Sequence, residues 1–174
     1  MIGNDVIDII QSRQESNWQR KGFIEKLFAP AEQLIIAQNP NPEIIIWLLW
    51  SMKEAAYKIY NRETKIREYI PKKLVCTIAS ITDDYSTGQV ICGETIYHTK
   101  TTITPNSLHT IAVTFVEDLN NVIEIEKKDI LKDEDGIPYL SSSSLHNTKD
   151  VSISHHGRFE KVVIIKKNKD KRSV

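Results

Sequence analysis

One segment constrains the fold more than any other, and it reads EIIIWLLWSMKEAAYKIY over residues 43–60. Its first half is apolar nearly all round, and its second half carries a polar stripe. At roughly 3.6 residues per turn the segment is about five turns long, which is typical of a helix in a globular protein. A helix that is apolar on every side must be covered by other elements. We therefore expect residues 43–60 to form a mostly buried, central helix.

The segments around this helix predict an α+β fold. Residues 2–10 are mostly apolar, apart from Gly3, Asn4 and two aspartates. This pattern is expected for a short strand that passes into a helix. Residues 18–38 have helical period, and Pro30 suits the first turn of a second helical piece. After residue 73 the apolar period becomes two. We expect a mainly antiparallel sheet packed against the long helix.

The expected strands follow from this period of two and from turn residues between them. A turn is expected at residues 83–88. One apolar face is expected to carry Ile111, Val113 and Phe115. The predicted strands cover residues 74–81, 89–104, 109–117, 122–125, 151–154 and 161–165.

Composition limits the possible partners. The chain has 174 residues, with 23 Lys and Arg against 23 Asp and Glu, so no net charge attracts it to nucleic acid. Cys76 and Cys92 lack the spacing of a zinc site or a disulfide framework. No apolar run is long enough for a bilayer, and no basic leader precedes the first apolar residues. We expect one domain over residues 1–165, a frayed basic tail at 166–174, and a cytoplasmic protein without nucleic-acid or membrane partners.

The motif WSMKEAAYK places two charged residues on one face of the long helix. Glu54 and Lys58 are four residues apart and share that face with Trp50, whereas Lys53 is rotated by about 100°. A Glu–Lys pair at this spacing is a common helix stabiliser. A carboxylate on such an apolar helix must nevertheless be paired, protonated or bound to a metal ion. Both interpretations stay open on this helix alone.

The opening motif GNDVID raises the same question, because Asp5 and Asp8 lie among isoleucines. A buried carboxylate needs a cation or hydrogen bonds, and either aspartate could cap the following helix. Alternatively, Asp5 and Glu54 come from separate elements to share Mg²⁺, which binds oxygen ligands and is completed by water and phosphate.

The motif VSISHHGR places hydroxyl and imidazole groups at the end of a predicted strand. Side chains alternate across a strand, so Ser152, Ser154 and His156 face one way while His155 faces the other. Together with Arg158, these donors suit a phosphate group. A solvent-exposed His pair is the alternative. A serine nucleophile is not expected, because neighbouring side chains point to opposite faces and GxSxG is absent.

Taken in order, the segments IGNDVIDI, LFAPAEQ, WSMKEAAYK, DGIPYL and VSISHHGRF resemble the motifs of the 4'-phosphopantetheinyl transferase superfamily, in particular its short holo-acyl-carrier-protein-synthase type. The resemblance covers residues 1–60 and 133–165. It implies Mg²⁺-dependent transfer of 4'-phosphopantetheine from coenzyme A to a serine of an apo acyl or peptidyl carrier protein. The second product would be adenosine 3',5'-bisphosphate.

The resemblance also implies roles for individual residues. Asp5 and Glu54 would hold Mg²⁺, and Glu54 or a metal-bound water would accept the serine proton. Glu54 and Lys58 are the expected catalytic residues. The expected contacts to coenzyme A come from Lys53, Lys58, Ser154, His155 and Arg158.

Three further expectations come from comparing the chain with this family. The chain makes one pass through the motifs, which implies an active cleft between the subunits of a homo-oligomer, with a trimer favoured. Arg13 is the basic residue nearest to the position used for carrier recognition, and Asp8 matches a second acidic position. The alternatives are a non-catalytic carrier-binding homologue of the same fold, and a structural α+β module in which Glu54 and Lys58 form an ordinary ion pair.

Overall fold

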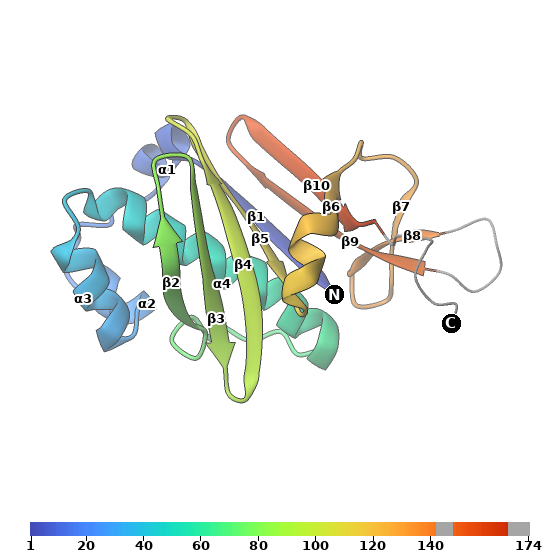
Figure 1. Ribbon diagram of the computed structural model, residues 1–174, viewed down its shortest axis with the longest axis horizontal. Helices are drawn as coiled ribbons and strands as arrows, with labels where there is room; N and C mark the ends of the chain where they lie inside the picture. The colour runs from blue at the N-terminus through green and yellow to red at the C-terminus, as the bar shows by residue number, and fades with distance from the viewer. Residues whose placement is uncertain (142–147, 167–174) are drawn as a thin grey trace.

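The computed structural model describes residues 1–141 and 148–166, and the predicted tail lies outside this range apart from Lys166 (Figure 1). The architecture is α+β, as predicted, with two antiparallel five-stranded sheets. The first sheet has the strand order β1-β5-β4-β3-β2, and the second has the order β6-β10-β9-β8-β7.

The helices lie mostly in the first half of the chain. After β1 (Ile2–Asp8) come α1 (Ile9–Glu15), α2 (Phe23–Leu27), α3 (Pro30–Gln38) and α4 (Pro42–Thr64). The first sheet is completed by β2 (Val75–Ile81), β3 (Tyr85–Cys92), β4 (Thr95–Ile103) and β5 (Ser107–Val113). A 3-10 helix, η1 (Val116–Asn121), leads to β6 (Val122–Glu124), β7 (Ile130–Lys132), β8 (Pro138–Ser141), β9 (Thr148–His156) and β10 (Phe159–Ile165).

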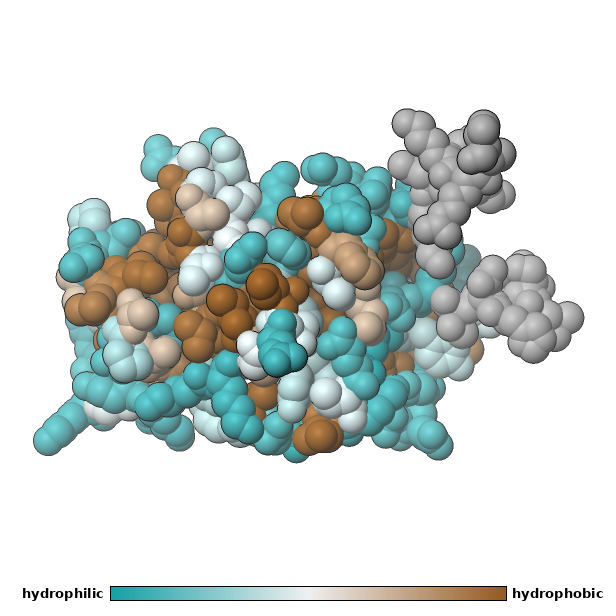
Figure 2. Space-filling view, turned by 60° about the horizontal axis from the view of Figure 1, so that its bottom comes forward, coloured by the Kyte–Doolittle hydropathy of each residue, from teal (hydrophilic) through white to brown (hydrophobic). Residues whose placement is uncertain are grey.

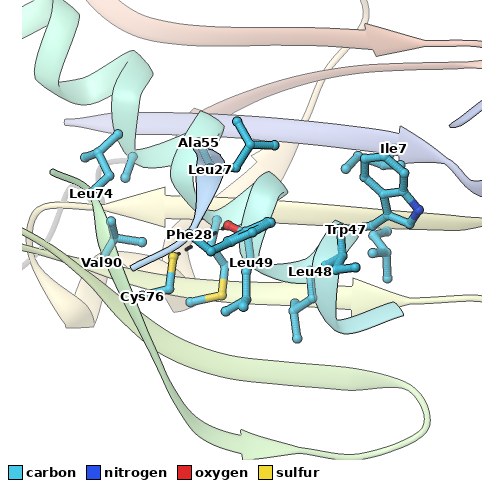
Figure 3. Close-up of a cluster of buried hydrophobic side chains, with 14 of the residues drawn as sticks. Ile7, Leu27, Phe28, Trp47, Leu48, Leu49, Ala55, Leu74, Cys76 and Val90 are labelled. Atoms are coloured by element: carbon cyan, nitrogen blue, oxygen red, sulfur yellow. Dashed lines mark hydrogen bonds between the residues drawn. The ribbon is translucent and has the colours of Figure 1, made fainter. Parts of the chain in front are cut away.

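Helix α4 lies across the first sheet and contacts β1 and β5 most extensively (Figure 1). It begins at Pro42, after an Asn41 side chain that accepts a hydrogen bond from the Ile44 amide. Its apolar first half is buried as expected, and Figure 3 shows Leu48 and Leu49 inside the core with Phe28, Cys76 and Val90. The helix approaches β1 so closely that a Cβ atom at Gly3 would overlap with a backbone carbonyl of α4. This close contact sets the distance between α4 and β1, which carries the opening motif.

Three predictions about the first sheet were wrong. Residues 89–104 form two strands, because Gly93 adopts a left-handed conformation (φ 61°) and lets the chain reverse between β3 and β4. The signal that was missed is Gly93-Glu94, which directly follows three consecutive apolar residues, Val90 to Cys92. The turn predicted at residues 83–88 is shorter, since β3 already begins at Tyr85. Phe115 follows the end of β5 and is 59% exposed, so it does not share the buried face of Val113.

The two sheets meet where β9 lies beside β1. One edge of β1 pairs with β5, whereas contacts at the other edge use side chains of β9. The amide of Asn4 donates to Ser152 Oγ (2.8 Å), and the amide of Asp8 donates to His156 Nδ1 (2.9 Å). Both contacts join residues that are 148 positions apart, so the two strands run in the same direction. This contact brings the two ends of the described chain together.

None of the helices in the described part of the chain has both the length and the apolar composition that a membrane span requires.

Candidate functional site

Lys58 marks the point where the three motifs meet. Its Nζ donates to the carbonyl oxygens of Asn4 in β1 (2.6 Å) and Ile153 in β9 (3.1 Å). It also lies 3.8 Å from Asp5 Oδ1. One side chain of α4 therefore contacts the opening motif and the Ser-x-Ser-His motif at once.

A cavity of about 290 Å³ opens beside this junction. Asp5 and Glu54 line it together with His155, and so do aromatic residues for which no role at the site was predicted. The further lining residues include Trp47, Trp50, Glu15 and His156. Helical spacing explains the tryptophans, because positions 47, 50 and 54 fall on one face of α4. The cavity thus combines three carboxylates, an imidazole pair and aromatic walls.

Burial perturbs all three charged groups at this junction. It raises the pKa of Asp5 to about 7, with the Lys58 ammonium opposing the shift and Glu54 adding to it. Burial also raises the pKa of Glu54, and it lowers the pKa of Lys58. Two desolvated carboxylates share one ammonium group, so the ionised site has a surplus of negative charge that a cation would stabilise.

The donor set fits a magnesium ion. Carboxylate oxygens of Asp5 and Glu54 are the hard ligands that Mg²⁺ prefers, and Mg²⁺ usually keeps waters and phosphate oxygens as its other ligands. Within residues 1–141 and 148–166, no group of three or more His, Cys, Asp and Glu side chains is arranged as a metal site. Two carboxylates alone would therefore have to be completed by water and substrate oxygens.

Lys53 does not contribute to this cavity. Its side chain is 1% exposed, and its Nζ donates to Glu32 (2.8 Å), to the Pro71 carbonyl (2.8 Å) and to the Leu74 carbonyl. An ammonium group has three N–H donors, and all three are used inside the protein. We therefore assign Lys53 to a buried ion pair. It also borders the second cavity described below, so its expected contact with coenzyme A stays a prediction. Glu32, which was not singled out from the sequence, is its partner.

The residues of the Ser-x-Ser-His motif are divided between the cavity and the contact with β1. His155 is exposed and lines the cavity. Ser154 is 5% exposed, and its Oγ lies 3.4 Å from the Asn4 side-chain amide. The alternation predicted for a strand is thus present, with the serine face turned towards β1. Of the two, His155 has the better access to a ligand.

Asp8 caps the first helix and holds Arg158. Its carboxylate accepts from the amides of Ile10 (3.0 Å) and Gln11 (3.4 Å). Of the two aspartates in the opening motif, Asp8 is therefore the helix cap. Arg158 donates to it through Nε (2.7 Å) and Nη2 (2.8 Å). This paired guanidinium holds the pKa of Asp8 well below its usual range. Arg158 therefore reaches a ligand only with the part of its guanidinium that Asp8 leaves free.

Arg13 lies on α1 and forms a bidentate pair with Glu43 of α4 (2.9 and 2.8 Å). Its side chain is 58% exposed. The structure places it on the surface at the start of α4, outside the cavity.

A second cavity, of about 360 Å³, meets the first one at Glu54. Its walls come from α4 and from the connection between α4 and β2, and they include Tyr57, Tyr69, Ile70 and Leu74. Residues 61–73 (NRETKIREYIPKK) are rich in charge, a composition that by itself favours a solvated connection. The signal that was missed is the run of Tyr69, Ile70 and Pro71, which is apolar enough to form a wall.

A second subunit is not needed to bring the motifs together. Residues of β1, α4 and β9 already line one cavity within a single chain. The homo-oligomer with an active cleft between its subunits stays a prediction.

Comparison with known proteins gives one family. No curated protein sequence matches the chain. The family model described as the 4'-phosphopantetheinyl transferase superfamily matches residues 1–116, which is more than half of the chain and includes β1 and α4. This match supports phosphopantetheinyl transfer as the general activity. The chain belongs to the 4'-phosphopantetheinyl transferase superfamily.

Proposed function

We propose that the protein transfers 4'-phosphopantetheine from coenzyme A to a serine of an apo acyl or peptidyl carrier protein, in a Mg²⁺-dependent reaction. The observation that carries this proposal is the shared cavity of Asp5 and Glu54, with Lys58 between the motifs. The family supports the group that is transferred. The donor, the metal ion and the acceptor are inferred from the chemistry of the cavity and from the motifs.

Asp5 and Glu54 would hold the magnesium ion through their carboxylate oxygens. A divalent ion at this position neutralises charge on a diphosphate and helps to align it for displacement. Glu54 or a metal-bound water would also accept the proton of the attacking serine.

Lys58 would stabilise the departing phosphate. Two of its N–H groups are fixed by backbone carbonyls, so the ammonium is held in one orientation beside Asp5. A fixed cation next to a developing negative charge needs little rearrangement during the reaction. His155 would donate a hydrogen bond to a phosphate group of coenzyme A. Arg158 and Ser154 remain weaker candidates for the same purpose because protein groups already engage them.

The second cavity is suited to the pantetheine arm of coenzyme A. It shares Glu54 with the first cavity, so a ligand held by its diphosphate at Asp5 and Glu54 could extend into it. Its apolar residues and tyrosines match an arm that alternates aliphatic groups with amides. The synthase subtype, a trimer and a cytoplasmic location remain predictions.

The test is incubation with coenzyme A, Mg²⁺ and several purified apo carriers, followed by intact-mass analysis. We expect the carrier to gain the mass of one phosphopantetheine group, and to gain nothing without Mg²⁺. Glu54→Gln should lower the rate by at least about a hundredfold, since it removes a base and a metal ligand. The matched control is Glu43→Gln on the same helix, which should keep wild-type activity.

Each alternative gives a different result. Mg²⁺-dependent binding of coenzyme A without any modified carrier would favour a non-catalytic carrier-binding homologue. The absence of such binding would favour a structural module. Full activity of a folded Glu54→Gln variant would show that the site is wrongly assigned.

A further inference from the structure

Helix α4 attaches to the second sheet through three cationic side chains. Lys58, Arg62 and Lys65 are four and three residues apart, so they lie on one face of α4 and at its end. Lys58 donates to a carbonyl of β9, and Lys65 pairs with Asp133 (2.9 Å), which follows β7. Arg62 lies between them and contacts both β8 and β9. The second sheet is therefore held against α4 by polar contacts at defined positions.

The contacts to β9 use an edge that is only partly paired. β8 pairs with β9 through Thr148–Asp150. Beyond this segment, the carbonyls of Val151 and Ile153 accept from Arg62 Nη2 (2.7 Å) and Lys58 Nζ (3.1 Å). Carbonyls two residues apart on a strand point to the same side, and the donors are one helical turn apart. The two side chains thus fix the position of β9 along α4.

Arg62 makes more hydrogen bonds to the second sheet than the other two cations do. It also donates to the Pro138 carbonyl (3.1 Å) and to Asp150 Oδ1 (3.3 Å). Its side chain is only 12% exposed, and its Nε is without a hydrogen-bond partner in the described residues. A guanidinium presents several donors in a rigid plane, which one ammonium group cannot reproduce. Arg62 lines neither of the two cavities at the candidate site.

We infer that Arg62 is a positioning residue for the proposed transfer reaction: by fixing the carbonyl of Val151, it sets where Ser154 and His155 lie relative to Asp5 and Glu54. The inference rests on the proposed function. Helix α4 continues beyond the WSMKEAAYK motif to Thr64 and turns Arg62 towards β9. Without Arg62, the hydrogen bond of Lys58 to Ile153 would be the remaining side-chain hydrogen bond from α4 to β9 among the described residues.

The experiment compares Arg62→Met, Arg62→Lys and Lys65→Met. Lys65→Met is the matched control, because it removes a cation of the same helix end that pairs with the turn after β7 and contacts no part of β9. For each variant we would measure kcat and the KM for coenzyme A, and record the ring signals of His155 and His156 by NMR. The ring signals report the position of β9 whether or not the protein is turning over.

The expected result is a KM for coenzyme A that rises roughly ten- to a hundredfold in Arg62→Met, with a smaller change in kcat and a shifted His155 signal. In Arg62→Lys the KM for coenzyme A should rise less, and in Lys65→Met it should equal that of the wild type. A folded Arg62→Met variant with unchanged KM and unchanged ring signals would overturn the inference. Should Arg62→Met fail to fold, wild-type KM and ring signals in Arg62→Lys would overturn it.

Failure of the proposed function gives a distinct result. In that case the wild-type protein itself transfers nothing to any carrier, and the inference about the reaction fails with it. If the wild type is active and only the Arg62 variants behave like the control, the function stands and the positioning role is wrong.

Discussion

The replacement of Lys53 by methionine tests the buried ion pair that this residue forms with Glu32. Lys53 and Lys58 are five residues apart on α4 and belong to the same motif, yet their surroundings differ. Lys53 is enclosed with Glu32, whose side chain is 0% exposed. Lys58 has a side chain that is 32% exposed and faces the cavity motifs. We expect Lys53→Met to lower stability, and Lys58→Met to lower activity.

The magnitude follows from the contacts that are lost. Removing one partner of a buried ion pair costs about 3–5 kcal/mol. Glu32 would keep hydrogen bonds from the Ala29 amide (2.7 Å) and the Cys76 amide (2.8 Å), which favours the lower end of that range. The carbonyls of Pro71 and Leu74 would lose their donor, which adds about 1 kcal/mol or more. We therefore expect a loss of about 4 kcal/mol, a large share of the ~5–15 kcal/mol of a typical domain.

The assay is urea unfolding followed by circular dichroism, with a double-mutant cycle between Lys53→Met and Glu32→Leu. The double variant should recover only part of the lost free energy of unfolding: both charges are removed, but the Ala29 and Cys76 amides then lose their acceptor. The control is Lys127→Met, which breaks an exposed ion pair with Glu160 (2.6 Å) and should unfold at nearly the wild-type urea concentration. A loss below about 1 kcal/mol for Lys53→Met, which is the range of an exposed pair, would refute the reasoning.

Two further predictions concern the junction between β1 and its neighbours. Burial, with Lys161 adding to it, lowers the pKa of His109 from 6.5 to about 4. Between these pH values the unfolded chain binds more protons than the folded protein, so the free energy of unfolding should rise with pH across this window. Urea titrations at several pH values should show a smaller rise in His109→Gln. Gly3→Ala should destabilise the protein by about 1–3 kcal/mol or prevent folding, because its Cβ would overlap with the Ala55 carbonyl; a thermal midpoint equal to that of the wild type would contradict this close approach of β1 to α4.

The sequence predicted the elements better than the turns between them. The apolar run of residues 44–50 predicted a buried helix, and Pro30 predicted the start of another helix. The structure has α4 and α3 at these positions. By contrast, the turn at Gly93 was missed, because a single glycine within a β-rich stretch is also compatible with a bulge in one continuous strand. A period of two says that residues alternate between faces, but it does not say where a strand ends and its neighbour begins.

For the candidate site, the motifs identified residue types but not their partners. The helical period showed that Lys53 and Glu54 point in different directions, yet it could not show which direction led to Glu32. Asp5 and Asp8 are both carboxylates among isoleucines, and only the structure separates the cavity-lining residue from the helix cap. Arg62 could not have been found, since its role depends on carbonyls of a strand about 90 residues further along.

The contact between β1 and β9 has a consequence for synthesis on the ribosome. The first sheet is complete once residue 113 has emerged, and the folding of early segments generally precedes that of later ones. The cavity, however, lacks His155 and the partners of the Asn4 and Asp8 amides until β9 has been made. A nascent chain can therefore hold a nearly finished scaffold while still being unable to bind its substrates.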